Sequence, residues 1–213
     1  MNIKASSQVL GVIGDPIAHS FSPDMHNAAI DALGVDFCYV AFHVSPDRVG
    51  EAVNGLRGLE ILGLNVTIPH KLAVMEHVDR ISEEALAVGA VNTIHNEDGN
   101  LTGHNTDVYG VVKAIERVVG VTTFPENCVV LGAGGAARAV TYALGSRDEV
   151  KQVTVMNRTV ERAESLAADM EKITGKRIVP EALDAPTEAR VFGDARLVVN
   201  TTSVGMHPKT DAS

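Results

Sequence analysis

The chain has 213 residues, 45% of them hydrophobic and 21% charged, and it carries a formal net charge of −9. This even mixture excludes a disordered, collagenous or repetitive chain, and no apolar run reaches the roughly 18 residues of a membrane span. The N-terminus also lacks the apolar run of a signal peptide. We therefore expect a soluble protein with no membrane partner, whose length allows one large domain or two modest ones.

The charge balance also bears on possible partners. Lys and Arg together number 18 against 27 for Asp and Glu, and the sequence shows no basic cluster. A protein that binds nucleic acid needs a basic face to displace counterions, so nucleic acid is not an expected partner. An anionic small molecule would have to find its positive charge locally.

The cysteines and histidines limit the chemistry further. Cys38 and Cys128 each lie in an apolar, strand-like run, which is typical of reduced core thiols in a cytoplasmic protein. The eight histidines show no H-x-x-x-H spacing and no cluster with cysteine, so we expect no metal site.

In the first half, expected strands and helices alternate. Strands are expected at 9–13, 36–44 and 61–66, helices at 22–33, 45–58 and 82–88, and a hairpin at 90–95 and 101–104. This order predicts a mostly parallel sheet flanked by helices. The first helix has Ser22 as a candidate cap, and its expected apolar face consists of Met25, Ala28, Ala29 and Leu33.

The second half repeats the pattern. A bridging helix is expected at 107–119, strands at 128–131, 153–156, 178–179 and 197–199, and helices at about 135–145 and 160–173. The boundary between the halves is expected between residues 105 and 122, and the sequence predicts an α/β fold throughout.

A glycine-rich segment follows the first strand of the second half. Gly132–Ala137 reads G-A-G-G-A-A, which fits G-x-G-x-x-A between a strand and a helix. Gly132 permits a tight turn, Gly134 lets the backbone approach a pyrophosphate, and the helix N-terminus offers N–H groups to the phosphates. A helix packed tightly on a sheet also uses small residues. The strand–helix–strand context favours a dinucleotide site, at Gly132, Ala133, Gly134, Gly135 and Ala136.

The next strand ends in Asn157-Arg158-Thr159, with Arg162 one helical turn later. In NAD-binding units this strand normally ends in an acidic residue that binds the ribose hydroxyls. A guanidinium instead binds a 2′-phosphate through charge-assisted hydrogen bonds, so this segment favours NADP over NAD. The alternative is that both arginines are ordinary surface residues, with Arg162 paired with a neighbouring glutamate.

Four polar motifs follow the strands of the first half, where open α/β sheets bind ligands. They are His19–Ser22, Asn65–Thr67 with Lys71, Ala90–Thr93, and Asn105–Asp107. Each also has an ordinary structural explanation: Ser22 and Asp107 as helix caps, Lys71 as a surface charge, His19 as a packing or hydrogen-bonding residue, and Asn65 and Asn92 as turn residues that bond their own backbone.

Taken together, the motifs resemble shikimate dehydrogenase, the NADP-dependent form. The resemblance rests on seven motifs in family order from about Val9 to Met206, namely GDPIAHSFSPxMHN, NVTIPHK, GAVNT, GHNTD, GAGGAARA, NRT and NTTSVGM. It implies a substrate-binding catalytic domain at 1–105 and a Rossmann-type NADP-binding domain at 106–213. The implied reaction is the reversible reduction of 3-dehydroshikimate to shikimate by NADPH, in aromatic amino-acid biosynthesis.

The resemblance also implies residue roles at matching positions. Ser20 and Ser22 match the pair that holds the substrate carboxylate, and the ring hydroxyls are assigned to Asn65, Thr67, Asn92 and Asp107. Lys71 and Asp107 match the catalytic pair. A segment beside the cofactor's ribose and nicotinamide is matched by Thr201, Ser203 and Met206.

Elementary chemistry supports the role of Lys71. Reducing a ketone places negative charge on its oxygen as hydride arrives, and a positioned ammonium stabilises and protonates that oxygen. We therefore expect Lys71 to be the general acid for reduction and the general base for the reverse reaction.

Two alternatives remain at this point. A quinate/shikimate dehydrogenase using NAD(P) has the same fold, although relatives that prefer quinate with NAD tend to carry an acidic residue in place of Asn157–Thr159. A non-catalytic, shikimate-binding regulatory protein on this scaffold would be expected to lose Lys71 and Asp107, and both are present.

The resemblance also sets an expectation for the end of the chain. The family continues beyond Met206 with further strands of the cofactor sheet and a C-terminal helical segment. We therefore expect a truncated chain with a partial cofactor domain. The sequence does not distinguish a monomer from a homodimer.

Overall fold

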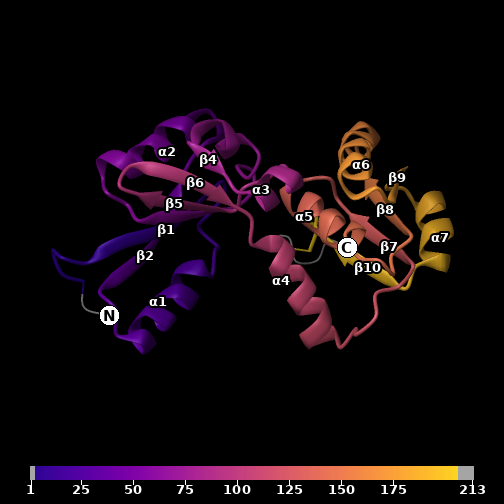
Figure 1. Ribbon diagram of the computed structural model, residues 1–213, viewed down its shortest axis with the longest axis horizontal. Helices are drawn as coiled ribbons and strands as arrows, with labels where there is room; N and C mark the ends of the chain where they lie inside the picture. Colours follow the sequence, from indigo (N-terminus) through magenta and orange to yellow (C-terminus); the bar gives the residue numbers. More distant parts are fainter. Residues whose placement is uncertain (1–2, 206–213) are drawn as a thin grey trace. The chain divides into compact units, whose positions relative to one another are not determined.

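The computed structural model describes residues 3–205. The chain divides into two compact units, Met1–Asn105 and Thr106–Ser213, and each unit has its own sheet (Figure 1). No helix among the described residues is long and apolar enough to cross a membrane.

The first unit is built on a six-stranded sheet in the order β2-β1-β3-β5-β6-β4. β1 pairs in parallel with β2 and β3, whereas β5 runs antiparallel to both of its neighbours, β3 and β6. The prediction of a mostly parallel sheet is confirmed. The strands are β1 (Gln8–Gly14), β2 (Phe37–His43), β3 (Gly63–Val66), β4 (Arg80–Ile81), β5 (Thr93–Glu97) and β6 (Asn100–His104).

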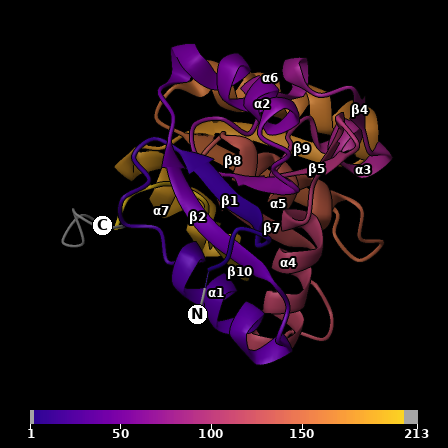
Figure 2. The same ribbon diagram turned by 90° about the vertical axis from the view of Figure 1, so that its left-hand side faces the viewer.

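Helices cover both faces of this sheet. They are α1 (Ser22–Leu33), α2 (Val49–Gly58) and α3 (Glu83–Val88), with 3₁₀ turns at Pro46–Arg48 and Ala73–His77. α1 and α2 lie on opposite faces (Figure 2). Ile13 packs with the α2 side of the core and its neighbour Val12 with the α1 side, because successive side chains of a strand point to opposite faces.

Helix α1 has the predicted limits but not the predicted buried face. Gly34 ends it in a left-handed conformation (φ 66°), as expected. Met25 and Leu33 are 62% and 75% exposed, and Ala28 and Ala29 are exposed as well. The inner face instead carries Ile30 and the half-buried His26 and Asn27. This prediction was wrong because a polar side chain, Asn27, makes the contact with the sheet.

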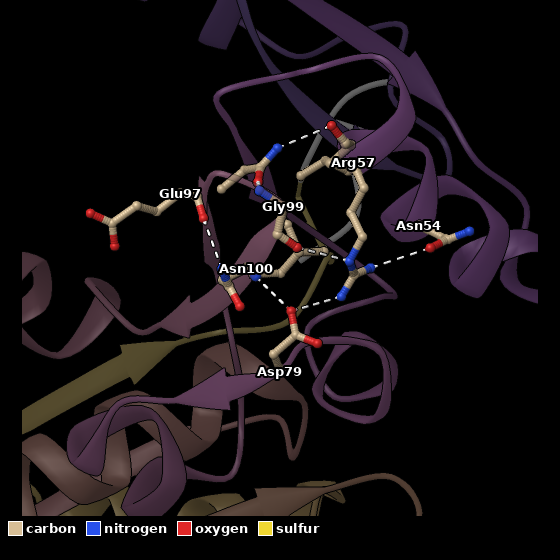
Figure 3. A network of polar contacts seen from close by, with 9 residues as sticks. Asn54, Arg57, Asp79, Glu97, Gly99 and Asn100 are labelled. Carbon is tan, nitrogen blue, oxygen red and sulfur yellow. Dashed lines mark hydrogen bonds and ion pairs between the residues drawn. The ribbon is translucent and has the colours of Figure 1, made fainter.

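β5 and β6 form a hairpin, as predicted. β5 and β6 are joined by Asp98 and Gly99, which both have positive φ (51° and 84°), as type I′ hairpin turns require. Figure 3 shows how α2 holds this hairpin. Arg57 donates to the carbonyl oxygen of Gly99 (3.0 Å) and to Oδ2 of Asp79 (2.8 Å), and the same oxygen accepts the N–H of Leu101 (2.7 Å).

The Leu101 N–H, and then Arg57, hold the pKa of Asp79 below its ordinary value of 3.8. A carboxyl whose pKa is depressed by folding adds stability above its unfolded pKa and loses it as the pH falls through the folded value. We therefore expect Asp79→Asn to be less stable than the wild-type chain at neutral pH, with the difference shrinking as the pH falls below 3.8. Thermal unfolding over a pH series measures this difference.

Glu97→Gln is the matched control for Asp79→Asn, because the Glu97 carboxylate belongs to the same hairpin and points away from these contacts (Figure 3). Glu97→Gln should leave the melting temperature nearly unchanged at every pH. A stability difference between Asp79→Asn and wild type that does not vary with pH would contradict the assignment to the Asp79 charge.

The second unit has a four-stranded, all-parallel sheet in the order β10-β7-β8-β9. In a Rossmann fold the first three strands lie in the order 3-2-1 and the fourth strand lies on the other side of strand 1. β9, β8 and β7 match strands 3, 2 and 1, and β10 matches strand 4, so the strand order reverses between β7 and β10. The predicted Rossmann-type arrangement is confirmed. The strands are β7 (Asn127–Leu131), β8 (Gln152–Asn157), β9 (Arg177–Ala182) and β10 (Leu197–Asn200).

The helices of this unit are α4 (Asp107–Ala114), α5 (Gly135–Gly145), α6 (Val160–Thr174) and α7 (Ala185–Asp194), and α4 continues as a π-helical turn over Ile115–Val119. Ile115, Leu144 and Leu166 join one core cluster, so α4, α5 and α6 pack on the same side. The sequence pattern did not predict α7, none of whose ten residues is buried. Its cap, Asp184, accepts the N–H of Thr187 and was the available local signal.

Both cysteines are free and buried, as predicted. Burial raises the pKa of the Cys128 thiol to about 11.

Candidate active site

Two of the predicted substrate residues of the first unit, Asn65 and Asn92, belong to one hydrogen-bonded set. Oδ1 of Asn65 accepts the Tyr39 hydroxyl (2.7 Å), and Nδ2 of Asn65 donates to Oγ1 of Thr93 (3.2 Å). The Thr93 hydroxyl then donates to Oδ1 of Asn92 (3.0 Å). Asn65 lies in β3 and bonds other side chains, so the turn-residue explanation is wrong for Asn65.

The two serines lie where β1 leads into α1. Oγ of Ser20 accepts the N–H of Ser22 (3.3 Å), and the Ser22 hydroxyl is close enough to Tyr39 to lower the pKa of the phenol, against the larger effect of burial, which raises it. The helix cap is Phe21, and Ser22 is the first helical residue. The explanation of Ser22 as a cap is therefore wrong.

The segment after β3 carries Thr67 and Lys71. The N–H of Thr67 donates to the carbonyl oxygen of Ile13 (2.9 Å), which ties the segment to the end of β1. The carbonyl oxygen of Lys71 accepts the N–H of Val91 (2.8 Å). The half-buried Lys71 therefore has its backbone fixed next to Asn92.

His70, which precedes Lys71, is buried (1% exposed). Its Nε2 lies 2.7 Å from the carbonyl oxygen of Val44, and this contact also holds the segment after β3 in place. His19 is exposed, which excludes a packing role, and its role as a hydrogen-bonding residue stays an expectation. Asn105 is buried and donates from Nδ2 to the carbonyl oxygen of Ala90 (2.9 Å), which links two of the sequence motifs.

Asp107 is the first residue of α4 and is half-buried. The cap of α4 is Thr106, so the explanation of Asp107 as a helix cap is wrong. Asp107 belongs to the second unit and Lys71 to the first.

The glycine-rich loop leaves β7 at its carboxyl end, beside the end of β10. Gly132 has φ 106°, and a Cβ on it would lie 2.7 Å from Oγ1 of Thr201. The Thr201 hydroxyl donates to the carbonyl oxygen of Leu131 (2.6 Å), and the N–H of Gly132 donates to the carbonyl oxygen of Met156 (2.7 Å). Glycine is therefore required at position 132, and the structure brings two predicted cofactor residues, Gly132 and Thr201, into contact.

The rest of the loop fits a dinucleotide. A Cβ on Gly134 would have nothing within 4 Å, so this exposed backbone has room for a phosphate. α5 begins at Gly135, and the first N–H groups of a helix have no intrahelical acceptor. Ala137, fully buried, allows α5 to pack closely on the sheet, as predicted. Ala133 and Ala136 are half-buried in the same turn.

Asn157, Arg158 and Thr159 follow β8, the strand next to β7, and Nδ2 of Asn157 donates to the Thr159 carbonyl (2.8 Å). Arg158, Thr159 and Arg162 are exposed. Three other arginines of this unit, Arg138, Arg147 and Arg190, are paired with carboxylates.

Ser203 is exposed in the turn after β10. Met206 lies outside the described residues. The predicted cofactor residues up to Ser203 thus follow three adjacent parallel strands, β10, β7 and β8, at one edge of the sheet. This edge is where open α/β sheets bind ligands.

Two protein-family models match the chain. One is described as the shikimate dehydrogenase substrate binding domain and matches residues 12–94, and the other, shikimate / quinate 5-dehydrogenase, matches residues 116–187. A shikimate dehydrogenase (NADP(+)) of Methanopyrus kandleri is 43% identical over 99% of the chain and 72% of that relative. The chain belongs to the shikimate dehydrogenase family.

Solved structures of shikimate dehydrogenases agree with this assignment. A shikimate dehydrogenase crystallised in complex with NADP+ has a TM-score of 0.87 and 39% identity, with 100% of this chain and 72% of that chain covered. The shikimate 5-dehydrogenase of Listeria monocytogenes, in complex with shikimate and NAD, has a TM-score of 0.85 and 33% identity, with 100% of this chain and 74% of that chain covered.

The sequence motifs did not identify three residues that contribute to the candidate site. Tyr39 bonds Asn65 directly, Asn27 holds the backbone of Tyr39, and His70 fixes the segment before Lys71. His70 and Asn27 stand inside the motifs that carried the resemblance, which was the available signal. Tyr39 stands outside all of them.

Proposed function

We propose that this chain catalyses the NADP-dependent interconversion of 3-dehydroshikimate and shikimate. The observation that carries the proposal is the set of uncharged donors and acceptors at the edge of the first sheet, formed by Ser20, Ser22, Asn65 and Asn92. Shikimate offers a ring carboxylate and several hydroxyl groups, which such hydroxyl and amide side chains bind without a tight ion pair.

The two serine hydroxyls are assigned to the substrate carboxylate. Asn65, Thr67, Asn92 and Asp107 are assigned to the ring hydroxyls. For reduction, the Lys71 ammonium donates its proton to the ketone oxygen as negative charge develops there. In the reverse direction Lys71 accepts that proton, and Asp107 acts with Lys71 as the carboxylate of the catalytic pair.

NADPH, when bound, supplies the hydride. The residues proposed to hold the cofactor begin with the turn from Gly132 to Ala136, whose N–H groups would face the pyrophosphate. Asn157, Arg158, Thr159 and Arg162 would bind the adenosine side. Thr201, Ser203 and Met206 are assigned to the ribose and nicotinamide side.

Arg158 tests the cofactor assignment, because its guanidinium is proposed to bind the 2′-phosphate that NAD lacks. Arg158→Ala should raise the KM for NADP about 10- to 100-fold, the effect of losing a hydrogen bond to a charged group, with the KM for NAD within about twofold of wild type. Steady-state kinetics with each cofactor at saturating shikimate measures both values.

Arg117→Ala is the control for Arg158→Ala, since Arg117 is an exposed arginine of the same unit in the π-helical turn after α4. It should leave both cofactor constants unchanged. Equal changes in the two constants of Arg158→Ala would show that Arg158 does not discriminate NADP from NAD.

One assay distinguishes the proposed activity from the two alternative functions. The chain is incubated with shikimate or with quinate, each with NADP or NAD, and the absorbance of reduced nicotinamide is followed. We expect the fastest reduction with shikimate and NADP. Faster turnover of quinate with NAD would establish the quinate/shikimate dehydrogenase that the second family model's description includes, and binding of shikimate without turnover would establish the regulatory protein.

A cytoplasmic location and a monomeric or homodimeric state belong to the same proposal. The two free, buried cysteines support a reducing compartment. Light scattering on the purified chain distinguishes a monomer from a homodimer.

A further inference from the structure

The phenol of Tyr39 lies at the centre of the polar set in the first unit. Tyr39 comes from β2 and is 3% exposed. Its hydroxyl donates to Oδ1 of Asn65 at 2.7 Å, and the Ser22 hydroxyl is close enough to lower the pKa of the phenol, against the larger effect of burial. Two residues assigned to different parts of the substrate, the carboxylate and the ring hydroxyls, therefore meet at one buried hydroxyl group.

Helix α1 holds the rest of this residue in place. Oδ1 and Nδ2 of Asn27 bond the backbone N–H and carbonyl of Tyr39, both at 2.9 Å. The His26 ring stacks on the Tyr39 ring with centroids 4.2 Å apart and an interplanar angle of 17°. Ser22 and His26 stand four residues apart and so share one helix face. The M-H-N part of the first sequence motif thus serves to fix Tyr39 in position.

The direction of the hydrogen bonds defines what Tyr39 does. A phenol has one proton, and Tyr39 gives it to Asn65, so the Asn65 amide must turn its NH₂ group to Thr93. Thr93 in turn gives its proton to Oδ1 of Asn92, which leaves the NH₂ group at the opposite end of the Asn92 amide. One proton therefore sets the orientation of two amides.

We propose that Tyr39 is a positioning residue of the substrate site, which orients the Asn65 and Asn92 amides. This inference rests on the proposed function. Burial raises the pKa of Tyr39 to about 12, so the phenol stays protonated and remains a donor at neutral pH.

Tyr39→Phe tests the inference, because it keeps the ring that stacks on His26 and removes only the hydroxyl. We expect the KM for shikimate and its dissociation constant by calorimetry to rise about tenfold, the effect of one lost donor to a buried amide. The kcat and the KM for NADP should stay within about threefold, since neither the proton donor nor the cofactor residues change. A merely structural role would lower the active fraction, and so kcat, without changing the KM.

A double-mutant cycle with Asn65→Ala shows whether Tyr39 acts through Asn65. If it does, adding Tyr39→Phe to Asn65→Ala should weaken shikimate binding by less than about twofold. Tyr109→Phe is the control, because the Tyr109 side chain is 63% exposed. The chain has three tyrosines and no tryptophan, so its absorbance at wavelengths longer than the phenylalanine bands reports tyrosine alone. Shikimate should perturb this absorbance in wild type and in Tyr109→Phe but not in Tyr39→Phe.

The outcomes separate the two proposals. A wild-type chain that neither binds nor oxidises shikimate overturns the proposed function, and with it the role of Tyr39. A wild-type chain that does both, with Tyr39→Phe unchanged in KM and dissociation constant, overturns the role of Tyr39 alone. An undiminished effect of Tyr39→Phe in the Asn65→Ala background also overturns it, because Tyr39 would then act by another route.

Discussion

Replacing Lys71 with alanine is expected to lower kcat for shikimate oxidation about a thousandfold, the combined effect of losing the proton acceptor and the charge that stabilises the alkoxide. The KM values for shikimate and NADP should change far less, because the serine, asparagine and glycine-loop contacts remain. Initial rates of NADPH formation at saturating concentrations of both substrates measure this loss. Turnover within about tenfold of wild type would show that Lys71 is not the general base.

The fold should survive this substitution. The hydrogen bond from Val91 to Lys71 uses the lysine's carbonyl oxygen, so it does not depend on the side chain. Lys71→Met keeps most of the side-chain volume and removes only the ammonium, and it should lose as much activity as Lys71→Ala while still binding shikimate. Lys113→Ala removes another half-buried lysine, paired with Glu116 at 2.7 Å, and should keep wild-type turnover.

Helix α1 shows what local signals in the sequence can and cannot determine. Its limits were predicted because Pro23 and Gly34 act locally, at the first turn and at the left-handed end. Its buried face was not, because the apolar residues of the predicted face are exposed and Asn27 bonds the backbone of β2. A pattern of hydrophobic residues carries no information about an inward-facing amide that bonds a backbone.

The candidate site divides in the same way. Residues at strand ends, such as Asn65 and Gly132, could be predicted because parallel strands bring their carboxyl ends to one edge. Tyr39 could not, since it stands in the middle of β2 and is separated from β3 by β1 in the sheet. Its link to Asn65 depends on the order of the strands and on a side chain long enough to span β1, and neither is a local property of the sequence.

Gly132→Ala is expected to lower kcat/KM for NADP about a hundredfold, because a shift of the loop by about 1 Å misplaces the N–H groups that face the pyrophosphate. Two effects act at this position. A φ of 106° is strained for alanine, and the new Cβ would lie 2.7 Å from Oγ1 of Thr201. The Thr201 oxygen is held by its hydrogen bond to Leu131, so the loop must move instead.

Gly175→Ala separates these two effects. Gly175 also has a positive φ, 67°, but a Cβ there would have nothing within 4 Å. It ends α6, whereas the cofactor residues follow the carboxyl ends of the strands. Gly175→Ala should therefore cost stability, about 1–3 kcal/mol in chemical denaturation, and keep wild-type kinetics with NADP. If Gly175→Ala weakened NADP use as much as Gly132→Ala, lost stability rather than loop geometry would be the cause.

Removing the obstructing oxygen provides the converse test. In the double variant Gly132→Ala with Thr201→Ala, the contact at 2.7 Å disappears and the nearest remaining heavy atom is Cγ2 of Thr202 at 3.3 Å. The steric effect is then relieved while the strain in φ persists. We expect the double variant to use NADP better than Gly132→Ala alone, measured as kcat/KM, even though Thr201→Ala by itself removes an anchoring hydrogen bond. Such a rescue can arise only if β10 and the glycine-rich loop meet at Gly132 and their contact sets the position of the loop.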